Sequence, residues 1–268
     1  MGQLTSVFTD LVVEGEALDK LVAGLDASQW ALKTPAPGWT IKHQIAHLAS
    51  VFHIAGLAGS DPDLFVKKTA GAEKDFDAAV ANLLRPHLAA SPDDLFARWR
   101  AEREAAVTAL AAVPPDQPVP WVARHLPAAV LACAGMMELF AHGQDIADTV
   151  GAQRVYTDRI GHLAWFATRN RDFGYHLRGL TPPDAQFRYE LVAPSGMVWE
   201  FGPADAEQRI TGPALDFCLL VTRRRHRDDL AMRATGADAD QWLDIAQAYR
   251  GAPGPGRRPG QFSGRTPA

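Results

Sequence analysis

The spacing of hydrophobic residues changes once along this chain, near residue 180, and this change is what most constrains the fold. Before it, apolar residues such as Val7, Leu11 and Leu18 recur at intervals of three, four or seven, the period of an amphipathic helix. After it, apolar and polar residues alternate, the period of a β-strand. The sequence therefore predicts a helical region followed by a smaller region that contains strands.

Local start signals divide the first region into four to five helices. Thr40 is positioned to cap a helix that runs to about residue 59. The stretch 91–94 combines a capping serine, a proline at the first helical position and two acidic residues in the first turn. Pro127 opens another helix that runs to about Val150, and Thr157 is positioned to cap one more. Helices joined by turns of varied length favour a helical bundle.

The second region combines strands with short helices. Phe187, Tyr189 and Leu191 alternate with polar residues, a turn follows at 194–196, and 197–201 has the pattern of a returning strand. A strand over 209–212 leads into a helix over 216–225, and a further helix is indicated around 242–246. We therefore expect a mainly α chain with three parts. They are a helical bundle over 1–178, an α+β domain over 179–250, and a disordered Gly-, Pro- and Arg-rich tail over 251–268.

Charge and cysteine content exclude several classes of protein. The 27 Lys and Arg against 31 Asp and Glu give a net charge of -4, which argues against nucleic acid as a partner. No apolar stretch reaches the roughly 18 uncharged residues that a membrane span needs, and no signal peptide is visible. We therefore expect a cytoplasmic monomer or homodimer. Two cysteines, Cys133 and Cys218, exclude a disulfide framework and a cysteine-based zinc site, and we expect both to be buried and reduced.

The first candidate site lies in the segment 37–48. His43 and His47 are four residues apart on the predicted helix, so both point to similar sides and are a possible metal pair. The alternative is that each is a solvated or hydrogen-bonded surface histidine. Trp39, at the start of the segment, is expected to serve in packing or capping of the bundle, and the alternative is that it lines a pocket.

The second candidate site lies on the predicted helix that ends near residue 150. Glu138, His142, Asp145 and Thr149 follow at spacings of four, three and four, so they share one face. Burying an unpaired carboxylate costs several kcal/mol, so such a face needs a metal, a partner charge or water. A Glu and a His four apart present an oxygen and a nitrogen to one point, which suits zinc. The alternative is a half-exposed helix with an ordinary polar face.

Together the two segments resemble a known family. Trp39 and His47, followed by Glu138-x-x-x-His142-x-x-Asp145, resemble the DinB-like superfamily, and within it the mycothiol-dependent maleylpyruvate isomerase type of actinobacteria. The resemblance covers essentially the whole chain except the tail. It implies a DinB-like four-helix bundle that binds a metal, joined to a smaller C-terminal α+β domain.

The resemblance also assigns roles to residues. It implies His47, Glu138 and His142 as metal ligands and leaves His43 at a variable polar position. The divalent metal is expected to be zinc, although this ligand set also accepts nickel, iron or manganese. Asp145 is then expected either to orient a metal ligand or to hold the polar part of a thiol cofactor.

An arginine of the second region is the candidate for substrate binding. The stretch 221–224 resembles a Leu-Thr-Gly-Arg-like stretch in which the arginine serves the substrate carboxylate. Arg224 is the best match, and Arg223, which replaces the small residue, is the second. The alternative is a solvated basic helix end that Asp228 and Asp229 balance.

These residues lead to an expected function and two alternatives. The resemblance implies an enzyme that activates a low-molecular-weight thiol, mycothiol, for S-transfer to, or cis–trans isomerisation of, a small electrophilic or anionic substrate. The first alternative is a thiol-independent metal enzyme of secondary metabolism, such as a hydrolase, lyase or cyclase. The second is a metal-stabilised protein that binds a small molecule without turnover.

Overall fold

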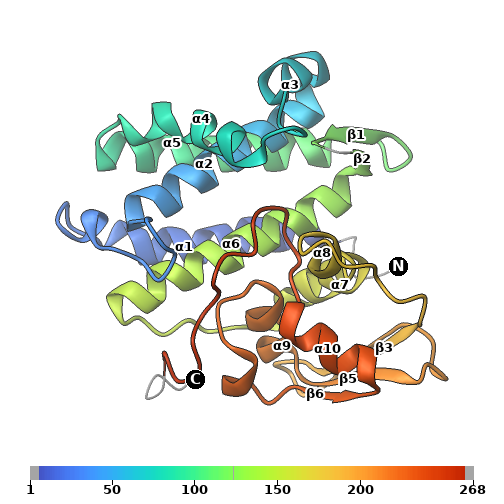
Figure 1. Ribbon diagram of the computed structural model, residues 1–268. Helices are drawn as coiled ribbons and strands as arrows, with labels where there is room; N and C mark the ends of the chain where they lie inside the picture. Colours follow the sequence, from blue (N-terminus) through green and yellow to red (C-terminus); the bar gives the residue numbers. More distant parts are fainter. Residues whose placement is uncertain (1–5, 123, 263–268) are drawn as a thin grey trace. The chain divides into compact units, whose positions relative to one another are not determined.

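The computed structural model describes residues 6–122 and 124–262 of the chain (Figure 1). The chain divides into two compact units, residues 1–152 and 153–268, and each is described here by itself.

Four long helices build the first unit. They are α1 (Val7–Ala23), α2 (Ile41–Ser60), α5 (Pro92–Ala111) and α6 (Ala128–Val150). Helix α2 packs against both α5 and α6, and α1 packs against α5 and α6 (Figure 1). The apolar stripe of α2, which includes Ile41, Ile45 and Leu48, is fully buried between them. The predicted helical bundle is therefore confirmed.

The predicted helix starts match the structure closely. The Ser91 hydroxyl accepts a hydrogen bond from the backbone N–H of Asp94 at 3.1 Å, and α5 begins at the next residue, Pro92. Helix α6 begins directly after Pro127 and ends at Val150. The next residue, Gly151, has a φ of 72°, the left-handed conformation that favours glycine. Local signals therefore fix the start of α5 and both ends of α6, the helix that carries Glu138 and His142.

Shorter elements complete the first unit. They are the 3₁₀ turn η1 (Gln29–Ala31), the helices α3 (Pro62–Thr69) and α4 (Phe76–Leu88), and the strands β1 (Pro118–Trp121) and β2 (Arg124–Pro127). The carboxylates of Asp61 and Asp75 cap α3 and α4. Each accepts a hydrogen bond from the backbone N–H of the third residue of its helix. The two strands pair antiparallel.

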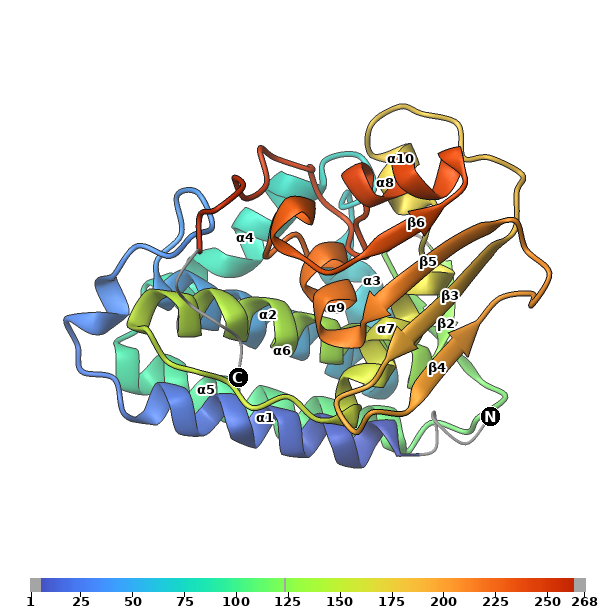
Figure 2. The ribbon, with the colours of Figure 1, turned by 90° about the horizontal axis from the view of Figure 1, so that it is seen from below.

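The second unit combines a four-stranded sheet with helices. Its helical elements are η2 (Asp158–Ile160), α7 (Gly161–Arg169), α8 (Phe173–His176), α9 (Ala214–Val221), η3 (Arg227–Asp229) and α10 (Ala237–Ile245). Its strands are β3 (Phe187–Val192), β4 (Val198–Phe201), β5 (Gln208–Pro213) and β6 (Arg233–Thr235). The order across the sheet is β4-β3-β5-β6, which Figure 2 shows. Strands β3 and β4 form the predicted antiparallel hairpin, and β5 is parallel to β3.

Aromatic side chains from the sheet and helices form the core of this unit. The rings of Tyr189 on β3 and Phe217 on α9 lie 5.7 Å apart between centroids, and that of Trp242 on α10 lies 6.0 Å from Phe217. Leu191 and Ile210 are fully buried beside them. The mainly α chain with a smaller α+β region is thus confirmed.

The unit boundary and the C-terminal segment differ from what the sequence indicates. The units meet between residues 152 and 153 rather than near 178, because α7 and α8 pack against α9, α10 and β4. Residues 251–262 also have defined contacts within the second unit. Gln247 donates to the carbonyl of Gly251 at 3.0 Å, and the N–H of Gly260 donates to Asp229 at 2.8 Å. The rest of the expected tail, 263–268, lies outside the described residues.

Two observations on the described residues concern a membrane span and the cysteines. No helix there is both long enough and apolar enough to cross a membrane. Cys133 and Cys218 are both buried, and neither forms a disulfide.

Candidate metal centre

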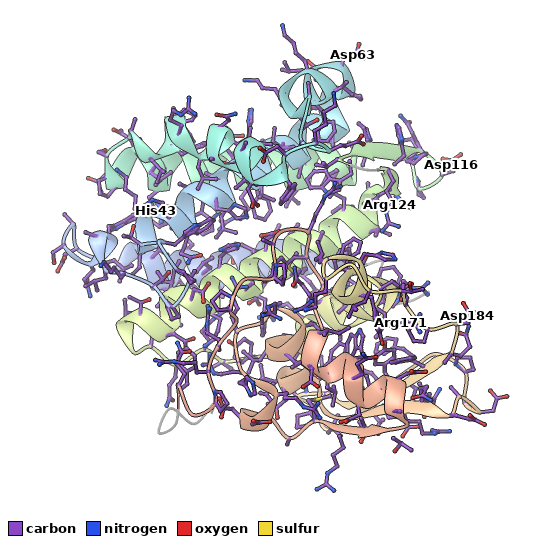
Figure 3. All side chains as sticks on the ribbon, in the orientation of Figure 1. His43, Asp63, Asp116, Arg124, Arg171 and Asp184 are labelled. Carbon is purple, nitrogen blue, oxygen red and sulfur yellow. The ribbon has the colours of Figure 1, made fainter. Side chains whose placement is uncertain are left out.

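The N-terminal end of α2 is fixed by Thr40 and His43. The backbone N–H of Thr40 donates to Nδ1 of His43 at 3.3 Å, and the Thr40 hydroxyl lies 2.8 Å from the same nitrogen. This reciprocal contact is a capping box, and it commits the His43 imidazole to the helix terminus. Figure 3 marks His43 on this helix. Its role in capping agrees with the variable polar position that the resemblance implies.

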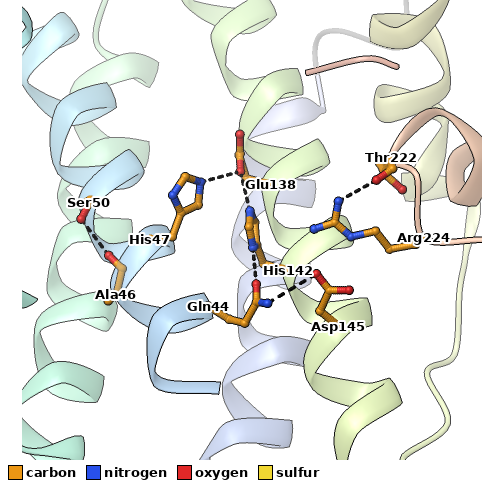
Figure 4. A network of polar contacts seen from close by, with 9 residues as sticks. All are labelled: Gln44, Ala46, His47, Ser50, Glu138, His142, Asp145, Thr222 and Arg224. Atoms are coloured by element: carbon orange, nitrogen blue, oxygen red, sulfur yellow. Dashed lines mark hydrogen bonds and ion pairs between the residues drawn. The ribbon is translucent and has the colours of Figure 1, made fainter. Parts of the chain in front are cut away.

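One turn further along α2, His47 meets two side chains of α6. Its Nε2 lies 3.2 Å from Oε2 of Glu138, and Nε2 of His142 lies 3.1 Å from the same oxygen (Figure 4). The two imidazole centroids are 4.5 Å apart. One ligand atom from each residue lies within 4.8 Å of the others. The structure thus brings the three sequence-predicted ligands together from two helices of the bundle.

The spacing of the three donor atoms suits a divalent metal. Two ligand atoms that each lie about 2.0–2.1 Å from a tetrahedral ion are about 3.3 Å apart. Oε2 of Glu138 lies at nearly this distance from Nε2 of His47 and from Nε2 of His142. Two imidazole nitrogens and one carboxylate oxygen form a set that zinc and other borderline divalent ions accept. Three protein ligands leave further coordination positions open, as in catalytic sites.

The surroundings of Glu138 favour its ionised form. Its side chain is 18% exposed, and burial raises the pKa of this carboxyl. Hydrogen bonds from His142 and His47, together with the positive charge that these imidazoles can carry, outweigh burial and hold the pKa of Glu138 well below its usual range. Glu138 is therefore an anion at neutral pH and is ready to act as a ligand.

Gln44, a residue that the sequence analysis does not select, connects the centre to a buried network. Its Oε1 accepts a hydrogen bond from Nδ1 of His142, so Nε2 of that ring is directed at Glu138. The Gln44 amide nitrogen donates to Thr34 at 2.9 Å. It also donates to Asp145 at 3.4 Å, as Figure 4 shows. Its position in the sequence could have indicated this role, because Gln44 lies about one helical turn before His47 on α2.

Asp145 belongs to this network and is fully buried on α6. Its Oδ2 accepts from Gln44, which in turn contacts His142, so Asp145 is linked to the candidate ligand through one intervening side chain. His47 differs from His142 in this respect. Its Nδ1 is buried and has no hydrogen-bond partner among the residues that the structure describes.

Trp39 lies against the two imidazoles. Its ring centroid is 5.8 Å from that of His142, with planes 20° apart, and 5.4 Å from that of His47. The Trp39 carbonyl accepts from the Thr34 hydroxyl at 3.0 Å, which ties this loop to the Gln44 network. Trp39 therefore packs against both imidazoles and lines the centre, the alternative that the sequence leaves open.

The two candidate arginines lie in the second unit, at the end of α9. Arg224 is 8% exposed, and its Nη1 donates to the carbonyl of Thr222 at 2.6 Å (Figure 4). Arg223 has a φ of 58°, the left-handed region that favours glycine. The N–H groups of Arg223 and Arg224 donate to the carbonyls of Leu220 and Leu219, each at 2.8 Å, and complete a Schellman motif. The predicted helix over 216–225 therefore ends at Val221.

Comparisons with known proteins bear on both units. The family model described as the mycothiol maleylpyruvate isomerase N-terminal domain matches residues 11–147, a range that contains His47, Glu138 and His142. A model described as wyosine base formation matches residues 189–235 in the second unit.

Full-length relatives and solved structures are also similar. An uncharacterized protein of Mycobacterium tuberculosis, from strains CDC 1551 / Oshkosh and ATCC 25618 / H37Rv, is 43% identical over 248 residues, which cover 92% of this chain and 96% of the relative. Crystal structures of the mycothiol-dependent maleylpyruvate isomerase and of a histidine-to-alanine mutant share the fold. Each aligns with a TM-score of 0.52 and 16% identity over 81% of this chain and 88% of that chain. The chain therefore belongs to the mycothiol maleylpyruvate isomerase N-terminal domain family, the type within the DinB-like superfamily that its sequence resembles.

Proposed function

We propose that this protein is a metal-dependent enzyme that activates mycothiol, a low-molecular-weight thiol. The thiol would be used for S-transfer to, or cis–trans isomerisation of, a small electrophilic, anionic substrate. The observation that carries the proposal is the convergence of His47, Glu138 and His142 on one point. Membership of the family favours mycothiol as the thiol.

The three converging side chains are the proposed ligands. His47, Glu138 and His142 would hold a divalent metal, which would supply a lowered pKa to a bound thiol and so favour its thiolate at neutral pH. Glu138 contributes a negative charge, which its contacts with the two imidazoles maintain. Gln44 accepts a hydrogen bond from Nδ1 of His142, so Nε2 is the nitrogen that would bind the metal after it gives up its proton.

Two further residues have proposed roles around the ligands. Asp145 is proposed to fix the orientation of His142 through Gln44, and this is supported by the hydrogen bond between Asp145 and Gln44. Asp145 is also the candidate for holding the polar part of mycothiol. Trp39 shields one side of both imidazoles from water, since its ring lies against them.

The thiolate accounts for both proposed reactions. For isomerisation, its sulfur adds to an activated cis double bond, and the electron pair moves into the adjacent carbonyl to give an enolate. The former double bond is now a carbon–carbon single bond and can rotate. Elimination of the same thiolate then leaves the trans olefin. For S-transfer, the sulfur either adds and the carbon is protonated, or it displaces a leaving group. Arg224 is proposed to bind the substrate carboxylate, since a guanidinium pairs with it through two hydrogen bonds.

Spectroscopy of the cobalt-substituted protein tests the proposal. Titration with mycothiol should produce a thiolate-to-cobalt charge-transfer band, and His43→Ala should retain it because His43 serves in capping. Glu138→Gln should lose the band. If no band forms at saturating mycothiol, the thiol-dependent function is excluded, and a thiol-independent metal enzyme takes its place. A substrate that is released chemically changed excludes a protein that only binds it.

A further inference from the structure

The loop directly before α2 has a fixed backbone at the residue that lies against the imidazoles. Its tip is a β-turn in which the N–H of Trp39 donates to the carbonyl of Ala36 at 3.0 Å. Pro37 and Gly38 occupy the two central positions, and Gly38 has a φ of 78°, the pattern of a type II turn. The N–H of Thr34 then donates to the carbonyl of Trp39 at 2.8 Å and closes the loop.

A chain of hydrogen bonds runs from this loop to His142. The hydroxyl of Thr34 donates to the carbonyl of Trp39 at 3.0 Å. The same hydroxyl oxygen accepts from the amide nitrogen of Gln44 at 2.9 Å, and the amide oxygen of Gln44 accepts from Nδ1 of His142. Gln44 is fully buried, so neither end of its amide can turn to water instead.

The Trp39 carbonyl gives this chain its direction. A carbonyl only accepts, so the single hydroxyl hydrogen of Thr34 is committed to it. The Thr34 oxygen then has only lone pairs to offer, and Gln44 must turn its nitrogen toward it. The amide oxygen is left for His142, so Nδ1 of that ring is the donor and Nε2 is the nitrogen near Glu138.

Thr34 is the closer of the two groups that hold the Gln44 amide nitrogen. The other is Asp145, at 3.4 Å, which lies beyond the usual range of such bonds. Thr34 also reaches His142 by a second route, because its N–H and its hydroxyl both hold the carbonyl of Trp39. The Trp39 ring is stacked on the His142 imidazole, with planes 20° apart.

We propose that Thr34 is a positioning residue of the metal centre. Through Gln44, its hydroxyl determines which nitrogen of His142 would bind the metal, and through the Trp39 backbone it holds the ring that packs on the same imidazole. The inference rests on the proposed function, because it takes His142 as a ligand. Groups that orient a histidine ligand from behind change metal affinity about 10–100-fold.

Three variants of the full-length protein test this role. Thr34→Val replaces the hydroxyl by a methyl group of similar size, and Thr34→Ser keeps the hydroxyl. Thr69→Val is the matched control, because Thr69 is also half-buried in the first unit and donates its hydroxyl to a backbone carbonyl, that of Phe65, at 2.9 Å.

Two measurements are made on each variant. The first is the exchange with water of the Nδ1 hydrogen of His142, followed by nitrogen-15 NMR of the metal-free protein, with His142→Gln identifying the signal. The second is zinc affinity by competition with a chelator. Thr34→Val should exchange this hydrogen at least tenfold faster and bind zinc about tenfold or more weakly. Thr34→Ser and Thr69→Val should match the wild type in both.

Wild-type behaviour of Thr34→Val in either measurement would overturn the proposal. Failure of Thr34→Ser to restore both would do so too, since the methyl group rather than the hydroxyl would then be responsible. A wild-type protein that binds no zinc would instead refute the proposed function. The exchange of the Nδ1 hydrogen, which is measured without metal, would still decide whether Thr34 orients His142.

Discussion

Gln44 accepts a hydrogen bond from Nδ1 of His142, and this contact determines which nitrogen of the imidazole faces Glu138. The amide of Gln44 is held in turn by Thr34 and Asp145, so its own orientation is fixed from the other side. A buried amide that orients a candidate ligand in this way affects metal affinity without contacting the metal.

Replacement of Gln44 by methionine should therefore weaken metal binding. Methionine has a similar size but accepts no comparable hydrogen bond, so His142 loses the partner that fixes its tautomer. We expect the affinity for zinc to fall about 10–100-fold, measured by competition with a chromogenic chelator. Ser50→Ala is the matched control. Ser50 is buried on the same helix and donates to the carbonyl of Ala46, away from the ligands (Figure 4). Equal affinities of the two variants would contradict a positioning role for Gln44.

Loss of a ligand should have a larger effect than loss of its support. His47→Ala and Glu138→Gln each leave two of the three proposed donors, and we expect zinc affinity to fall about a hundredfold or more. Metal content of the purified proteins, measured by atomic emission, gives the first readout. His43→Ala should keep full metal content, although it removes the acceptor of the Thr40 N–H at the start of α2 and lowers the melting temperature. Metal content that survives both ligand changes would refute the triad.

Much of the fold was predictable because its signals are local. The capping serine and proline at the start of α5 and the alternating pattern of β3 each act within a few residues. The helices α3 and α4 were not predicted. The first has only eight residues, and the second contains Pro86 near its end. Strand β1 includes prolines at 118 and 120, which sequence rules place in loops.

The candidate site was predictable only in part, for a related reason. Glu138 and His142 share a helix face, so their proximity follows from spacing alone. Spacing does not decide whether His43 or His47 completes the set, since both lie on α2; the resemblance to the family does. The structure shows the physical reason, which is that His43 is occupied by Thr40. Gln44 was not selected because its role depends on a tertiary contact.

Glycine at position 223 should give a more stable protein than alanine there. The left-handed backbone at this position costs a residue with a Cβ about 1–2 kcal/mol, and glycine avoids that cost. Its greater freedom in the unfolded chain returns about 0.5–1 kcal/mol, so a net gain of about 1 kcal/mol or less remains. We expect Arg223→Gly to melt about 1–4 °C above Arg223→Ala, because both variants lose the guanidinium but only alanine keeps the strain. Identical melting temperatures would mean that the turn carries no strain.

The two cysteines should be inert toward thiol reagents in the native protein. Burial raises the pKa of the Cys133 thiol to about 12, and burial also raises the pKa of Cys218 well above its usual range. At pH 8 very little of either thiol is then ionised, and both side chains are buried away from a reagent in solution. A chromogenic disulfide reagent should therefore detect no thiol in the folded protein and two in guanidinium chloride. Rapid labelling of either cysteine in the folded state would show that the chain supplies a nucleophilic thiol of its own, which would remove the need for an external one.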